Sequence, residues 1–315
     1  MHRVIGYRPD GKGKGTVRRI SQVVKRSMGM LQGERECEDD EDDKGKVGWS
    51  RIGKANWLIV KPDLYALDHA SPSPESGPEM VVLSSVVQIS SSDYYLTADG
   101  GYRGASSFSP EFATVKPSCT NEQPDIAPFK TDFNVVKDNI KWLQDVAITD
   151  GFVLKCGLVP PYTDNFRFKV YHVLFKPLQC SEASTDNAED RESSDKVDDL
   201  DGIFLIGNWL TFNDTTKGGL ENIKKTHHVV PIPAYNMKGN LIDPHQYHHA
   251  LEGATVELHF TLTHWSFSAK ADQPVSMCVD TYTGDIVMIC VISPPIYTPG
   301  TPSKCTVSQF FDPNQ

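Results

Sequence analysis

The sequence lacks the features that would assign it to a functional class at once. Its longest apolar runs, such as residues 286–292, are far too short to span a bilayer. The first ten residues contain no apolar core of signal-peptide length. The seven cysteines are widely spaced and include no C-x-x-C pair, which argues against a disulfide framework or a zinc ribbon. We therefore expect no membrane contact, and an intracellular protein, in the nucleus or the cytoplasm, with reduced and mostly buried thiols.

Decisive catalytic motifs are also missing. No G-x-S-x-G elbow occurs, which leaves a serine hydrolase of that design without support. Residues 6–12 have the glycine and lysine spacing of a phosphate-binding loop, but Gly13 stands where that loop needs Ser or Thr. Acidic residues are plentiful, yet no catalytic pair can be assigned without geometry. We expect a binding protein rather than an enzyme, and no cofactor.

The charge of the chain is unevenly distributed. Residues 34–43 and residues 181–201 each have a net charge of −7, so the rest of the chain carries +4 against a total of −10. Acidic runs of this kind are usually solvated and disordered. The remainder is mildly basic, which permits a polyanionic partner without requiring one. We interpret 181–201 as a disordered acidic insertion within a β-rich domain that covers 46–315.

Residues 1–45 are interpreted as a disordered basic and acidic tail in front of that domain. Residues 1–30 contain eight Lys or Arg against one Asp. Apolar side chains recur at three- and four-residue steps from Val17 to Leu31, which predicts a helix with Thr16 as its cap and Gly33 as its stop. Its basic face suits phosphate or an acidic protein partner. The alternative is a solvated arm that folds back on the acidic run of 34–43.

Most of the remaining pattern predicts strands. β-branched and aromatic runs bounded by Gly, Pro, Ser and Asp favour strands, and they cover 56–60, 80–89, 152–159, 166–175, 203–212, 227–234, 255–267 and 285–293. One packing helix is predicted from Phe133 to Ala147, with Thr131 or Asp132 as its cap and Gly151 after its end. The fold class is therefore mainly β, or α+β, as a barrel or a sandwich.

The most informative segment is 251–265, LEGATVELHFTLTHW. It places Val256, Leu258, Phe260 and Leu262 on one face of a long strand, and a loop and a closing apolar strand, DIVMICVI at 285–292, follow it. This order resembles that of uncharacterised proteins of mushroom-forming fungi. In outline it is similar to the last strands of OB-type single-stranded-DNA-binding proteins. The resemblance covers residues 203–295 and brings no catalytic residues with it.

The resemblance implies an OB-like barrel that binds single-stranded DNA or RNA through a positively charged groove and aromatic side chains on which bases stack. Residues of this chain that fit those roles are Arg167, Lys169, Tyr171, Trp209, Lys224, Lys225, His259, Trp265 and Tyr282. Two alternatives stay open. The tryptophans also fit core or rim positions, and Arg167 and Lys169 also fit the solvent face of an edge strand.

Two other functions compete with nucleic-acid binding. The first is a protein-interaction scaffold with the same β core, whose charged tails contact protein partners. The second is a metal enzyme of the cupin type, because seven of the ten histidines lie between 227 and 264 and imidazole clusters bind metals. Its ligands would be His245, His248 and Glu252, although Tyr247 stands where the second cupin ligand belongs.

Overall fold

The computed structural model describes residues 3–7, 18–21, 46–61, 78–107, 109–152, 154–160, 165–178, 202–268 and 278–296. In this part of the chain no helix is long and apolar enough to cross a membrane. The strands are β1 (Arg3–Tyr7), β2 (Arg18–Ser21), β3 (Val47–Ile52), β4 (Ala55–Val60), β5 (Met80–Tyr94), β6 (Ser118–Glu122), β7 (Leu154–Gly157), β8 (Phe168–Tyr171), β9 (Phe175–Pro177), β10 (His227–Val229), β11 (Ala234–Tyr235), β12 (Thr255–Phe267) and β13 (Val279–Ser293). The α-helices are α2 (Phe129–Asp145), α3 (Asp214–Ile223) and α4 (Tyr247–Leu251), and the 3-10 turns are η1 (Phe112–Thr114), η2 (Ile206–Asn208) and η3 (Pro244–Gln246).

The strands form one large mixed sheet that is partly ring-like. β5 pairs with β6, β6 with β8, β8 with β13, β13 with β12, and β12 returns to β5. Within this circuit only the β8–β13 pair is parallel. The β3–β4 hairpin and β1 extend the sheet from β12 and β5. A separate small sheet pairs β9 with β10.

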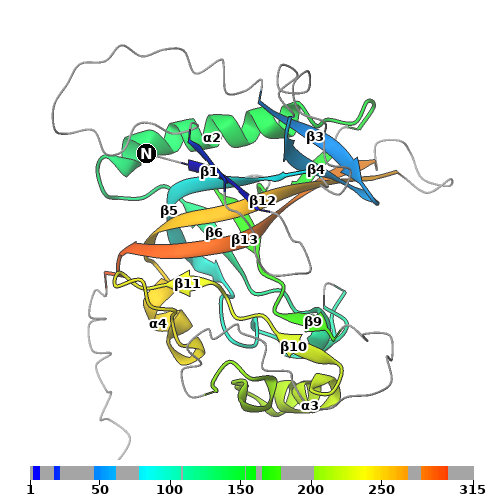
Figure 1. Ribbon diagram of the computed structural model, residues 1–315, viewed down its shortest axis with the longest axis vertical. Coiled ribbons are helices and arrows are strands. Elements are labelled where there is room, and N and C mark those ends of the chain that lie inside the picture. Colours follow the sequence, from blue (N-terminus) through cyan, green and yellow to red (C-terminus); the bar gives the residue numbers. More distant parts are fainter. Residues whose placement is uncertain are drawn as a thin grey trace, which may run out of the picture.

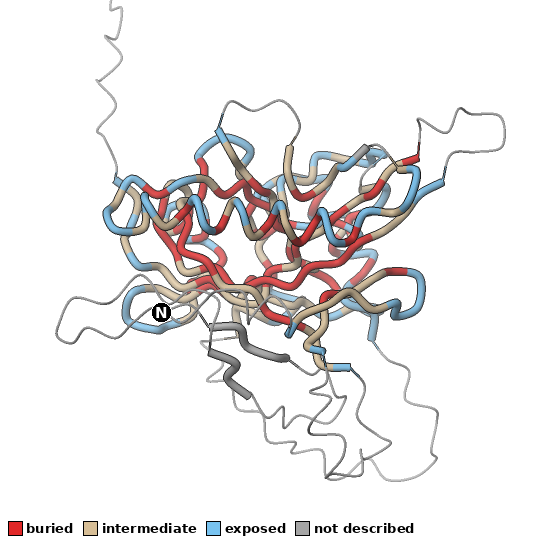
Figure 2. Tube along the Cα trace, turned by 90° about the horizontal axis from the view of Figure 1, so that it is seen from above, coloured by how far each residue is buried: buried red, intermediate tan, exposed pale blue. Residues whose placement is uncertain are grey.

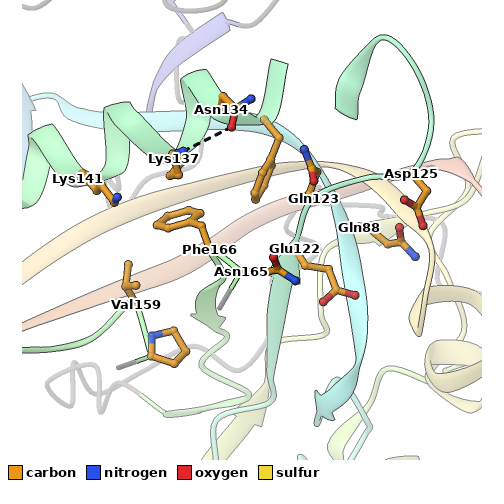
Figure 3. A pocket seen from close by; sticks show the side chains of 12 residues that line it. Gln88, Glu122, Gln123, Asp125, Asn134, Lys137, Lys141, Val159, Asn165 and Phe166 are labelled. Atoms are coloured by element: carbon orange, nitrogen blue, oxygen red, sulfur yellow. Dashed lines mark hydrogen bonds between the residues drawn. The ribbon is translucent and has the colours of Figure 1, made fainter. Parts of the chain in front are cut away.

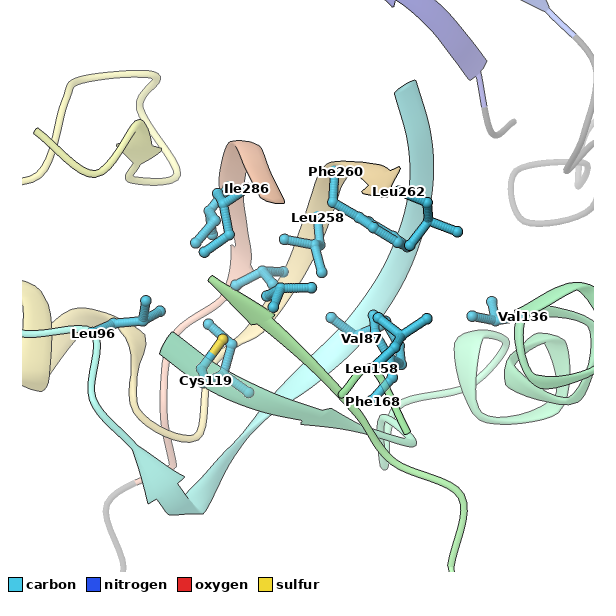
Figure 4. Packing of buried hydrophobic residues seen from close by; sticks show 14 of the residues in the cluster. Val87, Leu96, Cys119, Val136, Leu158, Phe168, Leu258, Phe260, Leu262 and Ile286 are labelled. Atoms are coloured by element: carbon cyan, nitrogen blue, oxygen red, sulfur yellow. The ribbon is translucent and has the colours of Figure 1, made fainter. Parts of the chain in front are cut away.

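The main hydrophobic core lies inside this circuit of strands. β12 supplies Val256, Leu258, Phe260 and Leu262, each at most 1% exposed, because alternate residues of a strand point to the same face. Figure 4 shows Leu258, Phe168 and Val87 pointing into the space that the strands enclose. Gly284 is part of the same packing, since a Cβ there would lie 3.0 Å from Val170 Cγ1.

Helix α2 covers one end of the core, across the molecule from α3, β9 and β10 (Figure 1). It buries Phe133, Val136, Ile140 and Leu143, the stripe that the helical spacing predicts. A second cluster joins α3 to the segment between β5 and β6 through Phe112, Leu220 and Trp209. Figure 2 shows the buried segments running through the middle of the molecule, with exposed turns around them.

The structure confirms a mainly β fold and most of the predicted elements. β12 has the predicted bounds, and β4, β5, β8 and β13 overlap the strands predicted there. The predicted packing helix is α2, although no side chain caps its start: the N-cap residue is Pro128, not Thr131 or Asp132. Among the described cysteines, Cys119, Cys156 and Cys290 are free thiols.

Two element predictions are wrong. Residues 203–212 form turns and η2 rather than a strand, because their apolar side chains serve the second cluster instead of a sheet. Residues 18–21 form β2 rather than part of a helix, since β2 pairs with β1 and β1 pairs with β5. The rest of the predicted N-terminal helix, the acidic run 34–43 and the insertion 181–201 lie outside the described residues.

Candidate functional site

The candidate site begins with the alternation of side chains along β8. Phe168 and Val170 are fully buried in the core, so Arg167, Lys169 and Tyr171 point to the other side of the strand. The basic and aromatic side chains of this stretch therefore share the outer side of the strand. β6 runs antiparallel beside β8, with Thr120 opposite Lys169. We call the outer side of these two strands the β6–β8 face.

Both cations of this face are held by carboxylates from neighbouring strands. Lys169 Nζ lies 2.9 Å from Asp93 Oδ2, and Arg167 Nη2 lies 2.8 Å from Glu122 Oε2. The side chains of Lys169 and Arg167 keep 20% and 34% of their surface exposed, so both pairs remain open to solvent. Exposed pairs of this kind contribute little to stability, about 0–1 kcal/mol, and a phosphate can therefore replace either carboxylate.

A bulge in β5 places Asp93 at this position. The pairing of β5 with β6 shifts register between Ile89 and Tyr94, and Asp93 has a positive φ of 60°, a conformation that Asp tolerates better than most residues. Thr120 Oγ1 donates a hydrogen bond of 2.8 Å to Asp93 Oδ2. Bulges redirect side chains and often lie beside functional sites. Here the bulge turns a carboxylate toward Lys169.

Two tyrosine rings flank Lys169. Its Nζ lies 5.5 Å from the ring centre of Tyr95 and 5.8 Å from that of Tyr171, within the range of a cation–π contact. Tyr95 is 44% exposed, and Tyr171 is half-buried. Burial raises the pKa of Tyr171 although Lys169 opposes the shift, so the phenol stays neutral at physiological pH. Sequence reasoning missed Tyr95, because nothing in its neighbourhood shows that the bulge leaves this ring exposed.

Three predicted aromatic residues are not available on any surface. Trp209, Tyr282 and His259 are 3%, 0% and 4% exposed. Trp209 Nε1 donates to Ala98 O at 2.7 Å, and Tyr282 Oη donates to Gln144 O at 2.9 Å. Through these hydrogen bonds both side chains connect segments that are far apart in the sequence, as buried aromatic residues with a polar group do. The prediction that these residues offer stacking platforms is wrong for this reason.

The other predicted residues lie apart from the β6–β8 face. Lys224 and Lys225 are exposed at the end of α3, at the opposite end of the molecule from α2 (Figure 1), and Lys224 Nζ pairs with Glu221. Trp265 is half-buried near the end of β12, in register with Thr281 of β13. That stretch of β13 pairs with β7 rather than with β8.

The predicted metal ligands form separate ion pairs. His245 Nδ1 lies 2.9 Å from Asp243 Oδ1, and His248 Nδ1 lies 2.7 Å from Glu252 Oε2. Throughout the described ranges, no group of three His, Cys, Asp or Glu side chains has the arrangement to hold a metal ion.

A buried polar network that sequence reasoning missed lies between the end of α2 and the β12–β13 hairpin. His264 Nε2 lies 2.9 Å from Asp280 Oδ1, and both side chains are almost fully buried. Thr149 donates to Asp280 through its backbone N–H at 2.9 Å and its hydroxyl at 2.8 Å. Burial raises the pKa of Asp280, but the hydrogen bonds from Thr149 and His264 outweigh it and lower the pKa overall. The stacking of His264 on Tyr282 at 4.7 Å marks this network as structural.

Comparison with known proteins identifies no family. No protein-family model matches the chain, and no curated protein matches it, so the resemblance to fungal proteins is not shown. Two solved structures are similar to it: the single-stranded DNA-binding protein from bacteriophage Enc34 in complex with ssDNA (10% identity, TM-score 0.33) and a C-terminal truncation of that protein (9% identity, TM-score 0.32). Each alignment covers 80% of this chain and 98% of the other. At these TM-scores the similarity carries no argument about function.

Proposed function

We propose that the chain binds single-stranded nucleic acid on the β6–β8 face of an OB-like barrel. The observation that carries this proposal is a cluster of two cations and two tyrosine rings on the outer side of a described circuit of five strands. The proposal rests on the pairing of the strands and on the contacts of the cluster.

The circuit supports an OB-like assignment through the order of its strands. Numbered along the chain, β5, β6, β8, β12 and β13 are strands one to five, and the circuit runs one, two, three, five, four and back to one. This is the Greek-key order of a five-stranded OB barrel. In that fold the face of strands two and three, with the loops one-two and four-five, binds oligonucleotides. Strands two and three of this chain are β6 and β8.

The cluster supports the assignment through its chemistry. Arg167 and Lys169 supply positive charge, and Tyr95 and Tyr171 supply rings held beside it. Proteins that bind single strands combine backbone charge with aromatic rings, and each stacked base contributes about 1–3 kcal/mol. Tyr95 lies at the start of the loop between strands one and two, which is one of the two loops that OB folds use.

The proposed contact set is smaller than the set predicted from the sequence. It keeps Arg167, Lys169 and Tyr171, adds Tyr95, and leaves out the three buried rings. Trp265 stays in the proposal because it stands next to the β12–β13 loop, the loop four-five of the assignment. Lys224 and Lys225 remain proposed phosphate contacts.

Removal of the two tyrosine rings that flank Lys169 tests the proposal. We expect Tyr95→Ala and Tyr171→Ala each to weaken binding of a labelled single-stranded oligonucleotide by about 5- to 150-fold, the range that a lost stacked base gives. Phe212→Ala is the matched control, since Phe212 is an exposed ring (58%) outside the face, and its affinity should not change. Equal affinity of all three variants and the wild type would refute the placement of the site. Parallel titrations with DNA and RNA of one sequence identify the preferred strand.

A further inference from the structure

A groove beside the β6–β8 face is lined by a different set of side chains. It has a volume of about 670 Å³ and lies between α2 and the segments that flank β7 and β8. Figure 3 shows Lys137 and Lys141 extending from α2 toward the ring of Phe166, with Glu122 and Asn165 on the other side of that ring. The groove therefore brings cations, a ring and amides together at one place.

The two lysines of the groove differ from the cations of the β6–β8 face. In the described part of the chain neither Lys137 nor Lys141 pairs with a carboxylate: Lys137 Nζ meets only Asn134 Oδ1, at 3.5 Å. Arg167 and Lys169 are each already paired with a carboxylate, which competes with a phosphate for the cation. Lys137 and Lys141 can neutralise a phosphate without that exchange. Their ammonium groups are the more accessible charges for a polyanion.

The ring of the groove is fixed in position. Phe166 is half-buried, and its centre lies 6.0 Å from that of Phe133 and 6.3 Å from that of Phe168. Neighbouring rings thus support one part of Phe166, while another part faces the groove (Figure 3). A ring held in this way can stack on a base at little entropic cost.

Two amides of the groove have unused hydrogen-bonding capacity. The side chains of Gln88 and Asn165 line the groove, and no hydrogen bond joins either amide to another described group. An amide both donates and accepts, so it can pair with the polar edge of a base. Stacking alone does not distinguish one base from another, whereas contacts of this kind do.

The groove is continuous with the β6–β8 face. Glu122, which pairs with Arg167 at 2.8 Å, also lines the groove, so the groove meets the face at this ion pair. A strand that crosses Lys169 and Arg167 therefore reaches the groove without leaving the surface.

We infer that this groove takes one nucleobase, together with its phosphate, from the strand bound on the β6–β8 face. The base stacks on Phe166, its polar edge meets Gln88 and Asn165, and the phosphate lies at Lys137 and Lys141. The inference rests on the proposed function and adds base selectivity to it. The β6–β8 face supplies affinity for any single strand, and the groove supplies a preference for one base.

The test measures affinity for labelled homopolymers of the four DNA bases. In the wild type we expect the four affinities to differ. In the Gln88→Ala/Asn165→Ala variant we expect the differences among the four affinities to be smaller. Asn222→Ala on α3 is the amide control, because Asn222 is exposed on another helix. Lys137→Gln/Lys141→Gln should lower the slope of log affinity against log salt by about 0.7, the change expected for one neutralised phosphate on a single strand. Lys238→Gln, in an exposed turn after β11, should leave the slope unchanged.

The outcomes separate the two proposals. If the groove variants leave both the differences among the four affinities and the salt slope unchanged while Tyr95→Ala still weakens binding, the groove is not a site and the proposed function stands. If the wild type binds no single strand at any salt concentration, both fail. A smaller difference among the four affinities in the Gln88→Ala/Asn165→Ala variant, together with a lower salt slope in the Lys137→Gln/Lys141→Gln variant, supports the groove as the site that distinguishes one base from another.

Discussion

At the scale of single residues, the candidate site is defined by ion pairs that a ligand must open. Asp93 and Glu122 neutralise the cations of the β6–β8 face. The carboxylate of Asp285 lies on the neighbouring strand, in register with Tyr171; burial raises its pKa while Lys116 partly opposes the shift. The local charge is therefore close to balanced. A phosphate that binds this face must therefore compete with the two carboxylates for Arg167 and Lys169.

Removal of one carboxylate should therefore tighten binding. We expect Asp93→Asn and Glu122→Gln each to raise the affinity for a single strand at low salt by about two- to fivefold, since an exposed pair contributes up to about 1 kcal/mol. Asn tolerates the positive φ of position 93. The difference should vanish at high salt, where exposed charges are screened. Asp214→Asn on α3, which removes an exposed pair with Lys217, is the control in the same fluorescence titration. Weaker binding of the two face variants would contradict the exchange of carboxylate for phosphate.

The buried carboxylate of Asp280 makes a prediction about pH. Because hydrogen bonds lower its pKa in the folded state, Asp280 contributes stability that is present above the unfolded pKa of about 4 and is lost as pH falls through the folded pKa. Asp280→Asn removes this contribution. We expect urea denaturation to show the variant less stable by about 1–3 kcal/mol at pH 7, with a smaller difference below pH 4. A difference in stability between the wild type and Asp280→Asn that stays constant down to pH 2 would show that Asp280 is not ionised in the folded protein.

At the scale of elements, the sequence predicts individual strands better than their arrangement. The alternation of apolar and polar side chains from Val256 to Leu262 is enough to define β12, although the structure buries both faces of this strand: His259 and Thr263 are at most 4% exposed. No local sequence pattern predicts that β12 pairs with β5, because the paired residues are far apart in the chain. For the same reason the sequence does not distinguish Trp209, which is buried, from Tyr95, which is exposed.

The closed circuit should depend on its enclosed side chains. Leu258 is fully buried between β5 and β13, so Leu258→Ala should lower the free energy of unfolding by about 2–5 kcal/mol. Leu205→Ala, at an exposed position (56%), should change it by about 0.5 kcal/mol or less. Thermal and chemical denaturation provide the measurement. Equal stability of the two variants would contradict a core inside the circuit.

A test of the sheet outside the circuit uses the close approach of β7 to β13. Gly157 has a φ of 91°, and a Cβ at this position would lie 2.3 Å from the backbone oxygen of Tyr282. Gly157→Ala therefore needs a shift of the backbone and adopts a strained conformation, which costs about 1–3 kcal/mol. Gly239→Ala is the control for strain alone, because Gly239 has a φ of 81° but no neighbour within 4 Å. We expect the lower melting temperature for Gly157→Ala, and the reverse order would argue against the parallel β7–β13 pairing.

At the scale of the whole molecule, the charge of the chain is divided between a mildly basic remainder and two acidic runs. Both runs lie outside the described residues. A hypothesis from the sequence alone is that residues 34–43 compete with nucleic acid for the positively charged groove expected of an OB-like barrel. Deletion of 34–43 should then tighten single-strand binding, whereas equal or weaker binding would refute the competition. The scaffold alternative predicts instead that deletion of residues 1–45 abolishes capture of a protein partner.

Hydrogen exchange of the full chain with and without a single-stranded oligonucleotide tests the central claim most directly. The account predicts slower exchange at Tyr95 and along residues 118–122 and 165–171, with protection that fades as salt rises because phosphate contacts carry the affinity. Protection confined to α3 and the β9–β10 sheet, or no protection at any salt concentration, would contradict it.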